Sequence, residues 1–375
     1  MRIAIVIPLL HKIAGNRLAL DIAEAFERLG NTVYLFSEIA SKEAIDYVSL
    51  TNLRDRFFYI RRKEANFSPL KYALRRFSRK KDRRLLKLLD TIHHKERFDV
   101  VLVISNEGHY LGQLLKKRYG AKAPLTALSI MELIEYPFIL NNQQKRYLLR
   151  LFTLPFLPFL HLIELNNIKK FDLIVSNSQW TSIMTQAFYG EMPEMSIASV
   201  NTSKFNFTPQ PGGERYIAFP TLGLKKNDIE VAINLKREGI NLLSFGPIHI
   251  NGIEYIGYLS ELQLRQVYAK ANATLYLFDY EALGLPVLES LASGTPVITT
   301  PKQGPYVVHA NNPNVHFMLS YETLLNTCRL FLSQDKTKAE IISCKDSVAG
   351  FSSDIVAENL VKILSNKKYL LNLTE

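Results

Sequence analysis

Short apolar runs typical of buried strands alternate with segments of helical periodicity from the first residues onward. In the first repeat, the run Ile3–Pro8 precedes a segment whose apolar residues from Leu18 to Leu29 share one helical face, and Gly30 ends that segment. The run Thr32–Phe36 then follows. Because parallel strands need a long crossover connection, usually a helix, this alternation predicts βαβ units and parallel sheets.

The alternation occurs in two series, which predicts an α/β protein with two doubly wound, Rossmann-like domains. A chain of 375 residues is also longer than one hydrophobic core normally grows. The best linker candidate is Asn201–Gly213, which ends in Thr-Pro-Gln-Pro-Gly-Gly. We expect an N-terminal domain at 1–200, a C-terminal domain at 214–350 and a C-terminal helix at 351–375. The further strands are expected at Phe57–Ile60, Val100–Ser105, Leu125–Ser129, Leu173–Ser176, Tyr216–Phe219, Asn241–Phe245, Glu254–Ile256, Ala273–Phe278 and Pro296–Thr299.

The cysteines and the apolar segments indicate the compartment. Cys328 and Cys344 lie 16 residues apart in what reads as one helical region, so we expect two buried thiols and no disulfide framework. The run Ile3–Leu10 lacks the small-residue cleavage site of a signal peptide, and Leu151–Leu160 is too short to span a bilayer. The sequence therefore predicts a cytoplasmic protein without a transmembrane helix.

The net charge of +11 is concentrated in one segment. Residues 54–97 contain 16 Lys and Arg against 5 Asp and Glu, which leaves 30 of each kind in the rest of the chain. Apolar residues recur there at helical spacing with basic residues largely on the other faces, which predicts a basic amphipathic helix, or two. The apolar set is Leu70, Ala73, Leu74, Phe77, Leu85, Leu88, Leu89 and Ile92, and the basic set is Arg75, Arg76, Arg79, Lys80, Arg83, Arg84 and Lys87.

Three interpretations of this basic segment remain open. The first is a core helix with a solvated positive face. In the second, residues 61–87 bind an anionic membrane surface, where each well-placed basic residue contributes on the order of 1 kcal/mol, and Leu151–Leu160 adds an apolar wedge. In the third, the same face binds nucleic acid, although aromatic side chains are not interleaved as stacking platforms would be.

The densest chemical pattern is the stretch Glu281 to Glu289, Glu-Ala-Leu-Gly-Leu-Pro-Val-Leu-Glu, which follows the expected strand Ala273–Phe278. Gly284 permits a tight backbone approach, and Pro286 occupies a position favoured at the start of a helix. A strand, a glycine-containing loop and a helix N-terminus present backbone N–H groups and a positive dipole end. This combination predicts a site for a phosphate group.

The two carboxylates should differ in role. Glu281 precedes the turn, where it could bond the hydroxyls of a sugar, and Glu289 lies in the first turns of the helix, where it could accept from ribose hydroxyls. The plainer alternatives are a solvated loop carboxylate at Glu281 and compensation of the helix dipole at Glu289. The two residues together favour the binding interpretation.

This stretch resembles the E-x7-E segment of retaining GT-B glycosyltransferases, of the family 4 type, which usually reads E-G-F-G-L-P-x-x-E before a G-T-P-V. The resemblance spans nearly the whole chain. Its other segments are Gly15–Val33, Asp172–Ser178, Gly257–Ser260, Tyr268–Ala273 and the closing helix at Phe351–Lys362.

The resemblance implies two Rossmann-like domains facing across a cleft, with the C-terminal helix crossing back to the first domain. It implies that a UDP- or GDP-type nucleotide sugar binds mainly to the second domain as the donor substrate, that the acceptor enters from the first, and that the sugar is transferred with retention. No metal and no permanently bound cofactor are required. The catalytic residues that it implies are Glu281, at the donor sugar, and Lys226, at the diphosphate, with Lys225 as the alternative cation.

The remaining residues of the implied nucleotide-sugar site are Gly15, Thr221, Tyr258, Ala282, Leu283, Gly284, Leu285 and Glu289. The chain departs from the family pattern at four places. Its N-terminal loop has Gly15-Asn16 where two glycines are common. Thr221 stands where an arginine usually precedes the lysine, Met131 stands where a histidine often follows the fifth strand, and Leu277–Tyr280 replaces a Pro-Ser pair.

We therefore expect a glycosyltransferase whose acceptor is a sugar, a membrane lipid or a lipid-linked glycan. We expect the protein itself to bind peripherally at the inner membrane face. The alternative is a weakly active GT-B protein that uses its 54–97 face to bind nucleic acid. A nucleotide-sugar epimerase or a phosphorylase is also compatible with such a fold.

Overall fold

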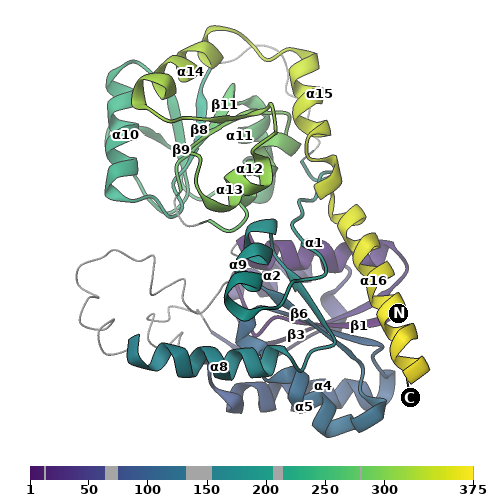
Figure 1. Cartoon of the computed structure of the whole chain (residues 1–375). Coiled ribbons are helices and arrows are strands. Elements are labelled where there is room, and N and C mark those ends of the chain that lie inside the picture. Colours follow the sequence, from purple (N-terminus) through teal and green to yellow (C-terminus); the bar gives the residue numbers. More distant parts are fainter. Residues whose placement is uncertain (12–13, 64–74, 132–153, 206–213, 279–280, 375) are drawn as a thin grey trace. The chain divides into compact units, whose positions relative to one another are not determined.

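The computed structural model describes residues 1–11, 14–63, 75–131, 154–205, 214–278 and 281–374 (Figure 1). These residues form two compact units. Unit 1 comprises Met1–Ala198 together with Asp354–Glu375, and unit 2 comprises Ser199–Ser353. Most of the expected linker, at 206–213, lies outside the described residues.

The described strands of unit 1 form one parallel sheet in the order β2-β3-β1-β5-β6-β7, with β4 also paired to β3. The strands are β1 (Arg2–Val6), β2 (Leu9–Leu10), β3 (Thr32–Ala40), β4 (Phe57–Arg62), β5 (Val100–Ile104), β6 (Leu125–Ile130) and β7 (Leu173–Ser176). The predicted parallel sheet is thus confirmed. The short strand β2 was not predicted, because Pro8 interrupts the run Ile3–Leu10 and a proline cannot donate to a strand ladder.

Helices cover both faces of this sheet, as the predicted βαβ units require (Figure 1). The α-helices of unit 1 are α1 (Ala14–Arg28), α2 (Lys42–Ser49), α4 (Arg79–Glu96), α5 (Leu111–Tyr119), α8 (Leu157–Ile168), α9 (Gln179–Tyr189) and α16 (Ser353–Thr374). Alternate strand residues such as Phe36 and Val103 pack against Leu85 of α4, Leu111 of α5 and Ile168 of α8, so these three helices share one face of the sheet.

Helix α16 joins unit 1 although it ends the chain. Arg28 of α1 forms an ion pair with Asp354 at 2.7 Å, and Lys367 forms one with Glu194 at 3.1 Å. The chain therefore leaves unit 1 after Ala198 and returns to it at Asp354.

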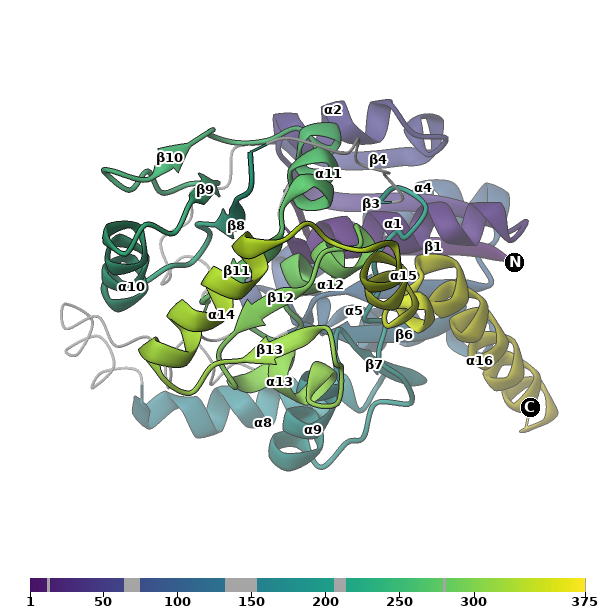
Figure 2. The ribbon, with the colours of Figure 1, turned by 90° about the horizontal axis from the view of Figure 1, so that it is seen from above.

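The described strands of unit 2 form a second parallel sheet, in the order β10-β9-β8-β11-β12-β13. They are β8 (Ile217–Pro220), β9 (Leu242–Phe245), β10 (Glu254–Tyr255), β11 (Ala273–Tyr276), β12 (Val297–Thr299) and β13 (Val315–Phe317). The sequence did not predict β13, which has three residues with a polar His316 at its centre. Figure 2 shows this sheet from above, with β8 and β11 at its middle.

The helices of unit 2 are α10 (Lys226–Arg237), α11 (Glu261–Lys270), α12 (Leu285–Ala292), α13 (Gln303–His309), α14 (Tyr321–Ser333) and α15 (Lys338–Asp346). Cys328 lies in α14 and Cys344 in α15, so the expected single helical region is two helices, the second begun by a capping box at Thr337. Both cysteines are buried free thiols. No helix in the described part of the chain is long and apolar enough to cross a membrane.

Candidate functional site

The order of the strands in unit 2 locates the candidate site. The chain moves outward from β8 to β10 on one side and from β11 to β13 on the other, so the direction of winding reverses between β8 and β11. These two strands pair in parallel through Ile217 with Ala273 and Ala218 with Thr274. In doubly wound sheets, ligands bind outside the carboxyl ends of the strands at this reversal. The residues that follow β8 and β11 are therefore the ones to consider.

The loop after β11 has the backbone geometry that the sequence predicted. Gly284 precedes α12 with a left-handed backbone, at φ +78° and ψ 57°, and Pro286 lies in the first turn of the helix. No side chain caps the N-terminus of α12. Leu283, Gly284 and Leu285 are buried, while Ala282 is half-buried. The N-terminus of α12 thus offers an uncapped, positive dipole end next to the loop.

Three hydrogen bonds hold Glu281 in place. The N–H of Leu283 donates to Oε1 of Glu281 at 3.2 Å, and the hydroxyl of Tyr276 donates to Oε2 at 3.2 Å. The N–H of Gly304, in α13, donates to the Glu281 carbonyl oxygen at 3.1 Å. The half-buried carboxylate is therefore oriented by hydrogen bonds, which differs from the plainer alternative of a freely moving, solvated loop side chain.

Glu289 is 3% exposed and lies in the second turn of α12. The pKa of the buried Tyr276 is raised well above its ordinary value, first by desolvation and then by the charges of Glu281 and, more weakly, Glu289. The tyrosine hydroxyl thus lies within the field of both carboxylates. The structure therefore places Tyr276 near both predicted site carboxylates, whose assignment to sugar and ribose binding stays a prediction.

The candidate cations lie at the other loop of this edge. Lys226 is the first residue of α10, its side chain is 90% exposed, and its Nζ lies 3.7 Å from Oε1 of Glu230. The backbone N–H of Lys225 donates to Oδ2 of Asp228 at 2.7 Å in the capping box of the helix. Lys226 therefore pairs on the helix surface in this structure, and its contact with a diphosphate stays a prediction.

Thr221, which follows β8, is fully buried. Its hydroxyl donates to the carbonyl of Phe245 at 3.0 Å and accepts from the N–H of Ile248 at 3.1 Å. The side chain thus ties the end of β8 to the residues after β9. Tyr258 differs from Thr221 in that it is 78% exposed. The assignment of these two residues to nucleotide binding stays a prediction.

Two close approaches at this edge were not predicted from the sequence. A Cβ atom on Gly223 would lie 1.9 Å from Cε2 of Phe278, and one on Gly304 would lie 2.0 Å from the carbonyl oxygen of Ala282. The loop after β8 and the first turn of α13 therefore pack directly against the segment that carries Glu281. Sequence alone offered no signal for either contact, because each joins residues that are distant along the chain.

Unit 1 contains one predicted site residue, Gly15, and also Met131, which stands where the resembled family often has a histidine. Gly15 is in α1, which begins one residue earlier, at Ala14. Met131 follows β6, where its N–H donates to Oδ1 of Asn106 at 3.0 Å and its carbonyl accepts from Nδ2 of Asn177 at 3.1 Å. The backbone of Met131 thus links the residues that follow β5 and β7.

The basic segment differs from its prediction in one respect. Leu85 and Leu89 are buried in α4, as expected, but Arg75, Arg76 and Lys81 are not on a solvated face. Their side chains are at most 11% exposed and form ion pairs with buried carboxylates. The prediction failed for Arg75 and Arg76 because their carboxylate partners come from other parts of the chain. Lys81 was not in the predicted basic set, and it pairs with its neighbour Asp82. Leu70, Ala73 and Leu74 lie outside the described residues.

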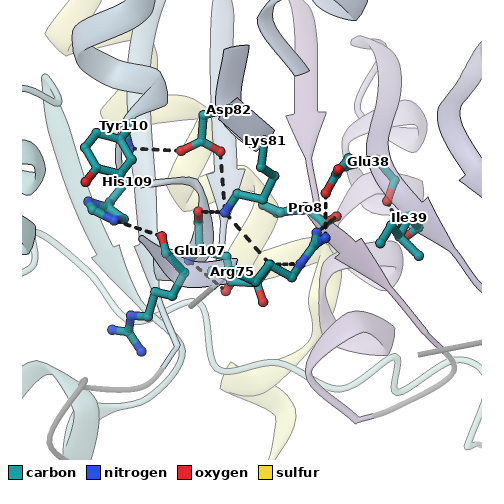
Figure 3. A network of polar contacts seen from close by, with 12 residues as sticks. Pro8, Glu38, Ile39, Arg75, Lys81, Asp82, Glu107, His109 and Tyr110 are labelled. Atoms are coloured by element: carbon teal, nitrogen blue, oxygen red, sulfur yellow. Dashed lines mark hydrogen bonds and ion pairs between the residues drawn. The ribbon is translucent and has the colours of Figure 1, made fainter. Parts of the chain in front are cut away.

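Figure 3 shows the network that these basic residues enter. Arg75 binds Glu38 of β3 at 2.5 Å, Glu107 after β5 at 3.1 Å, and the carbonyl of Pro8 after β1 at 2.9 Å. Lys81 also contacts the carbonyl oxygen of Glu107. The network therefore cross-links the carboxyl ends of the three central strands of unit 1.

Burial shifts the pKa values of two titrating groups next to this network. The pKa of Asp82 is raised to about 6, mainly by desolvation, which Lys81 and the N–H of Tyr110 oppose. The pKa of His109 is lowered to about 4, again mainly by desolvation. Among the residues that the structure describes, no group of three His, Cys, Asp or Glu side chains is arranged to hold a metal ion.

Comparison with known proteins adds a family match over part of unit 2. Residues 249–343 match the family model described as Glycosyl transferases group 1. This segment contains Tyr258, Glu281, Gly284 and Glu289, whereas Thr221 and Lys226 precede it. No curated protein matches the chain significantly.

Solved structures match almost the full length. Sucrose-phosphate synthase from Thermosynechococcus elongatus is 15% identical, with 97% of this chain and 98% of that chain covered and a TM-score of 0.71. Anabaena HepE in complex with UDP is 12% identical, with coverage of 98% and 100% and a TM-score of 0.68. A glycosyltransferase from Rickettsia africae is 15% identical, with 98% of both chains covered and a TM-score of 0.66. The chain thus has a two-unit α/β fold of the GT-B type, and its second unit carries the segment that matches group 1 glycosyl transferases.

Proposed function

We propose that this protein is a glycosyltransferase whose donor is a nucleotide diphosphate sugar, bound at the carboxyl edge of the unit 2 sheet. The observation that carries the proposal is the oriented carboxylate of Glu281 beside the uncapped N-terminus of α12, inside the segment that matches group 1 glycosyl transferases. The structural relative HepE is solved with UDP and with UDP-glucose, which supports a nucleotide sugar as the donor class.

In this proposal the N-terminus of α12 faces the diphosphate, where its positive dipole end stabilises the negative charge that grows as the bond to the sugar breaks. Glu281 accepts hydrogen bonds from sugar hydroxyls, and Glu289 accepts them from the ribose. Lys226 supplies a cation once its long, exposed side chain turns from Glu230 toward the diphosphate. These groups act without a metal ion, and the sugar is transferred with retention of configuration.

We further propose that the acceptor is a membrane lipid or a lipid-linked glycan. Arg79, Lys80, Arg83 and Lys87 form an exposed basic stripe on α4, at positions that recur about once per helical turn. Helix α8 lies on the same face of the sheet (Figure 1). Apolar side chains of this helix and of the residue before it are exposed. Phe156 is 63% exposed, Phe159 62% and Leu162 54%. A basic stripe and exposed aromatic residues on one layer of helices suit an anionic bilayer surface, and the protein would then act as a peripheral protein of the cytoplasmic membrane face.

The deciding experiment is a thermal-shift and hydrolysis panel of UDP, GDP, ADP and TDP sugars. Wild type is compared with Glu281→Ala and with a control, Glu322→Ala, which removes an exposed carboxylate from α14. We expect one nucleotide class to raise the melting temperature of wild type and the control, and Glu281→Ala to lose hydrolysis. If no sugar nucleotide stabilises wild type while DNA or RNA binds with a steep salt dependence, the nucleic-acid alternative replaces this proposal.

A further inference from the structure

Tyr276 is the last residue of β11 and is 3% exposed. Side chains two residues apart lie on the same face of a strand, so Tyr276 shares its face with Thr274. The hydroxyl of Ser290, in α12, donates to Oγ1 of Thr274 at 2.8 Å, which shows that this face of β11 packs against α12. The ring of Tyr276 therefore extends from a rigid strand into the space that Glu281 and α12 share.

The hydroxyl of Tyr276 can act only as a hydrogen-bond donor toward Glu281. Desolvation and the negative charge of Glu281 raise its pKa well above the ordinary value, so it stays protonated across the physiological range. A protonated phenol next to a carboxylate gives a charge-assisted hydrogen bond, which is stronger than a neutral one. The Tyr276 hydroxyl donates to Oε2 of Glu281, while the N–H of Leu283 donates to Oε1.

Each carboxylate oxygen has about two acceptor positions. Among the described residues, Tyr276 and Leu283 occupy one on each oxygen of Glu281 and leave one on each for another donor. We propose that Tyr276 is a positioning residue: its hydroxyl holds the Glu281 carboxylate so that the two remaining acceptor positions receive hydroxyl groups of the donor sugar. This inference rests on the proposed function, since it assigns the part of the donor that Glu281 recognises.

The inference predicts that loss of the Tyr276 hydroxyl affects binding of the sugar part of the donor and not binding of the nucleotide part. Without the tyrosine hydroxyl, the bond from the N–H of Leu283 is the one that the described residues still give the Glu281 carboxylate. The side chain regains rotamer freedom, so ordering it around a sugar costs more free energy. The nucleotide part does not touch this carboxylate in the proposal and should bind as before. Tyr276→Phe removes one oxygen atom and keeps the buried ring, so the core of unit 2 remains filled.

The test is a double-mutant cycle on the full chain with four proteins: wild type, Tyr276→Phe, Glu281→Ala and the double variant. Calorimetry measures the dissociation constants of UDP-glucose and GDP-mannose and of UDP and GDP. The control is Tyr216→Phe, which removes a hydroxyl that donates to the carbonyl of Val267 at 2.8 Å in the same unit. Melting temperatures without ligand verify that each variant is folded.

We expect Tyr276→Phe to weaken binding of the nucleotide sugar by about ten-fold, as for the loss of a charged hydrogen bond, and to change binding of the free nucleotide by less than about two-fold. In the Glu281→Ala background it should have no further effect. Equal weakening of sugar nucleotide and free nucleotide, or an undiminished effect without Glu281, overturns the role of Tyr276. If wild type binds UDP-glucose or GDP-mannose and Tyr276→Phe binds it equally well, only this inference fails. If wild type binds none of the UDP, GDP, ADP and TDP sugars, the proposed function itself fails.

Discussion

Arg76 and Glu164 form a buried ion pair in which Nη2 of the arginine lies 2.5 Å from Oε1 of the glutamate, with both side chains at most 4% exposed. The same carboxylate oxygen accepts from Nδ2 of Asn106 at 2.8 Å. The pair therefore joins the residues before α4, the residues after β5 and helix α8. It also explains why part of the basic segment does not face solvent.

Removing the carboxylate charge should destabilise unit 1 strongly. Glu164→Gln leaves the Arg76 guanidinium buried without its counter-charge, and we expect a loss of about 3–5 kcal/mol in the free energy of unfolding. The chain has one tryptophan, Trp180, which lies in α9 of unit 1, so its fluorescence during urea denaturation follows that unit. A surface pair supplies the control. Asp354→Asn breaks a pair with Arg28 that is 44–48% exposed and should cost less than about 1 kcal/mol. Equal losses for the two variants would contradict the role of burial.

The pH dependence of stability should change when Asp82 is replaced. The folded-state pKa of this carboxyl is about 6, against an ordinary value of 3.8, so between these values the folded protein holds a proton that the unfolded chain has lost. Its contribution is fully present below about pH 4 and is lost as the pH rises through 6. Relative to wild type, Asp82→Asn should therefore become more stable as the pH rises from 4 to 7, by up to about 3 kcal/mol.

His109 has the opposite effect on stability over the same pH range. Its pKa is lowered to about 4, so stability linked to this residue is present above pH 6.5 and is lost as the pH falls toward 4. In Asp82→Asn, the rise in stability with pH that His109 causes is no longer offset by Asp82. Urea denaturation from pH 4 to 7 measures the slope of the free energy of unfolding against pH. A variant whose slope equals that of wild type would show that Asp82 titrates normally.

The loop that carries Glu281 should not tolerate a side chain at Gly304. A Cβ there would lie 2.0 Å from the Ala282 carbonyl oxygen, so Gly304→Ala must displace that loop or the start of α13. We expect a loss of about 1–3 kcal/mol in stability, together with weaker binding of sugar nucleotides in calorimetry. Gly350→Ala is the matched control, since a Cβ there meets no atom within 4 Å. Unchanged sugar-nucleotide binding by Gly304→Ala would show that this contact does not support the binding site.

Membrane association should depend on the exposed stripe of α4. Changing Arg79, Lys80, Arg83 and Lys87 to Glu should abolish cosedimentation with vesicles of anionic phospholipid, because each basic residue near such a surface contributes about 1 kcal/mol. Arg75 and Arg76 are unsuitable for this test, since their burial would confound binding with folding. The control makes the same charge change in unit 2, at Lys236, Arg237, Lys270 and Lys338. Equal loss in both sets would indicate attraction to net charge and not to α4.

The parts of the molecule set by local pattern could be predicted from the sequence. The alternation of apolar runs and helical periods predicted parallel sheets, and Gly284 with Pro286 predicted the turn before α12, because both depend on neighbours along the chain. The short strands β2 and β13 could not be predicted in this way. Strands of two or three residues carry too few side chains to show a period, and their pairing partners define them.

By itself the sequence thus determined the class of fold, the two-part division of the chain and the position of the Glu281–Glu289 segment, since each rests on residues close together in the chain. Only the tertiary structure decided what the side chains do. It turned Arg75 inward to Glu38 and Glu107, paired Lys226 with Glu230, and placed Tyr276 against Glu281. Periodicity tells which face of an element is apolar, but burial and charge pairing depend on which distant segment packs against that face. That choice is made when the sheet and its helices assemble.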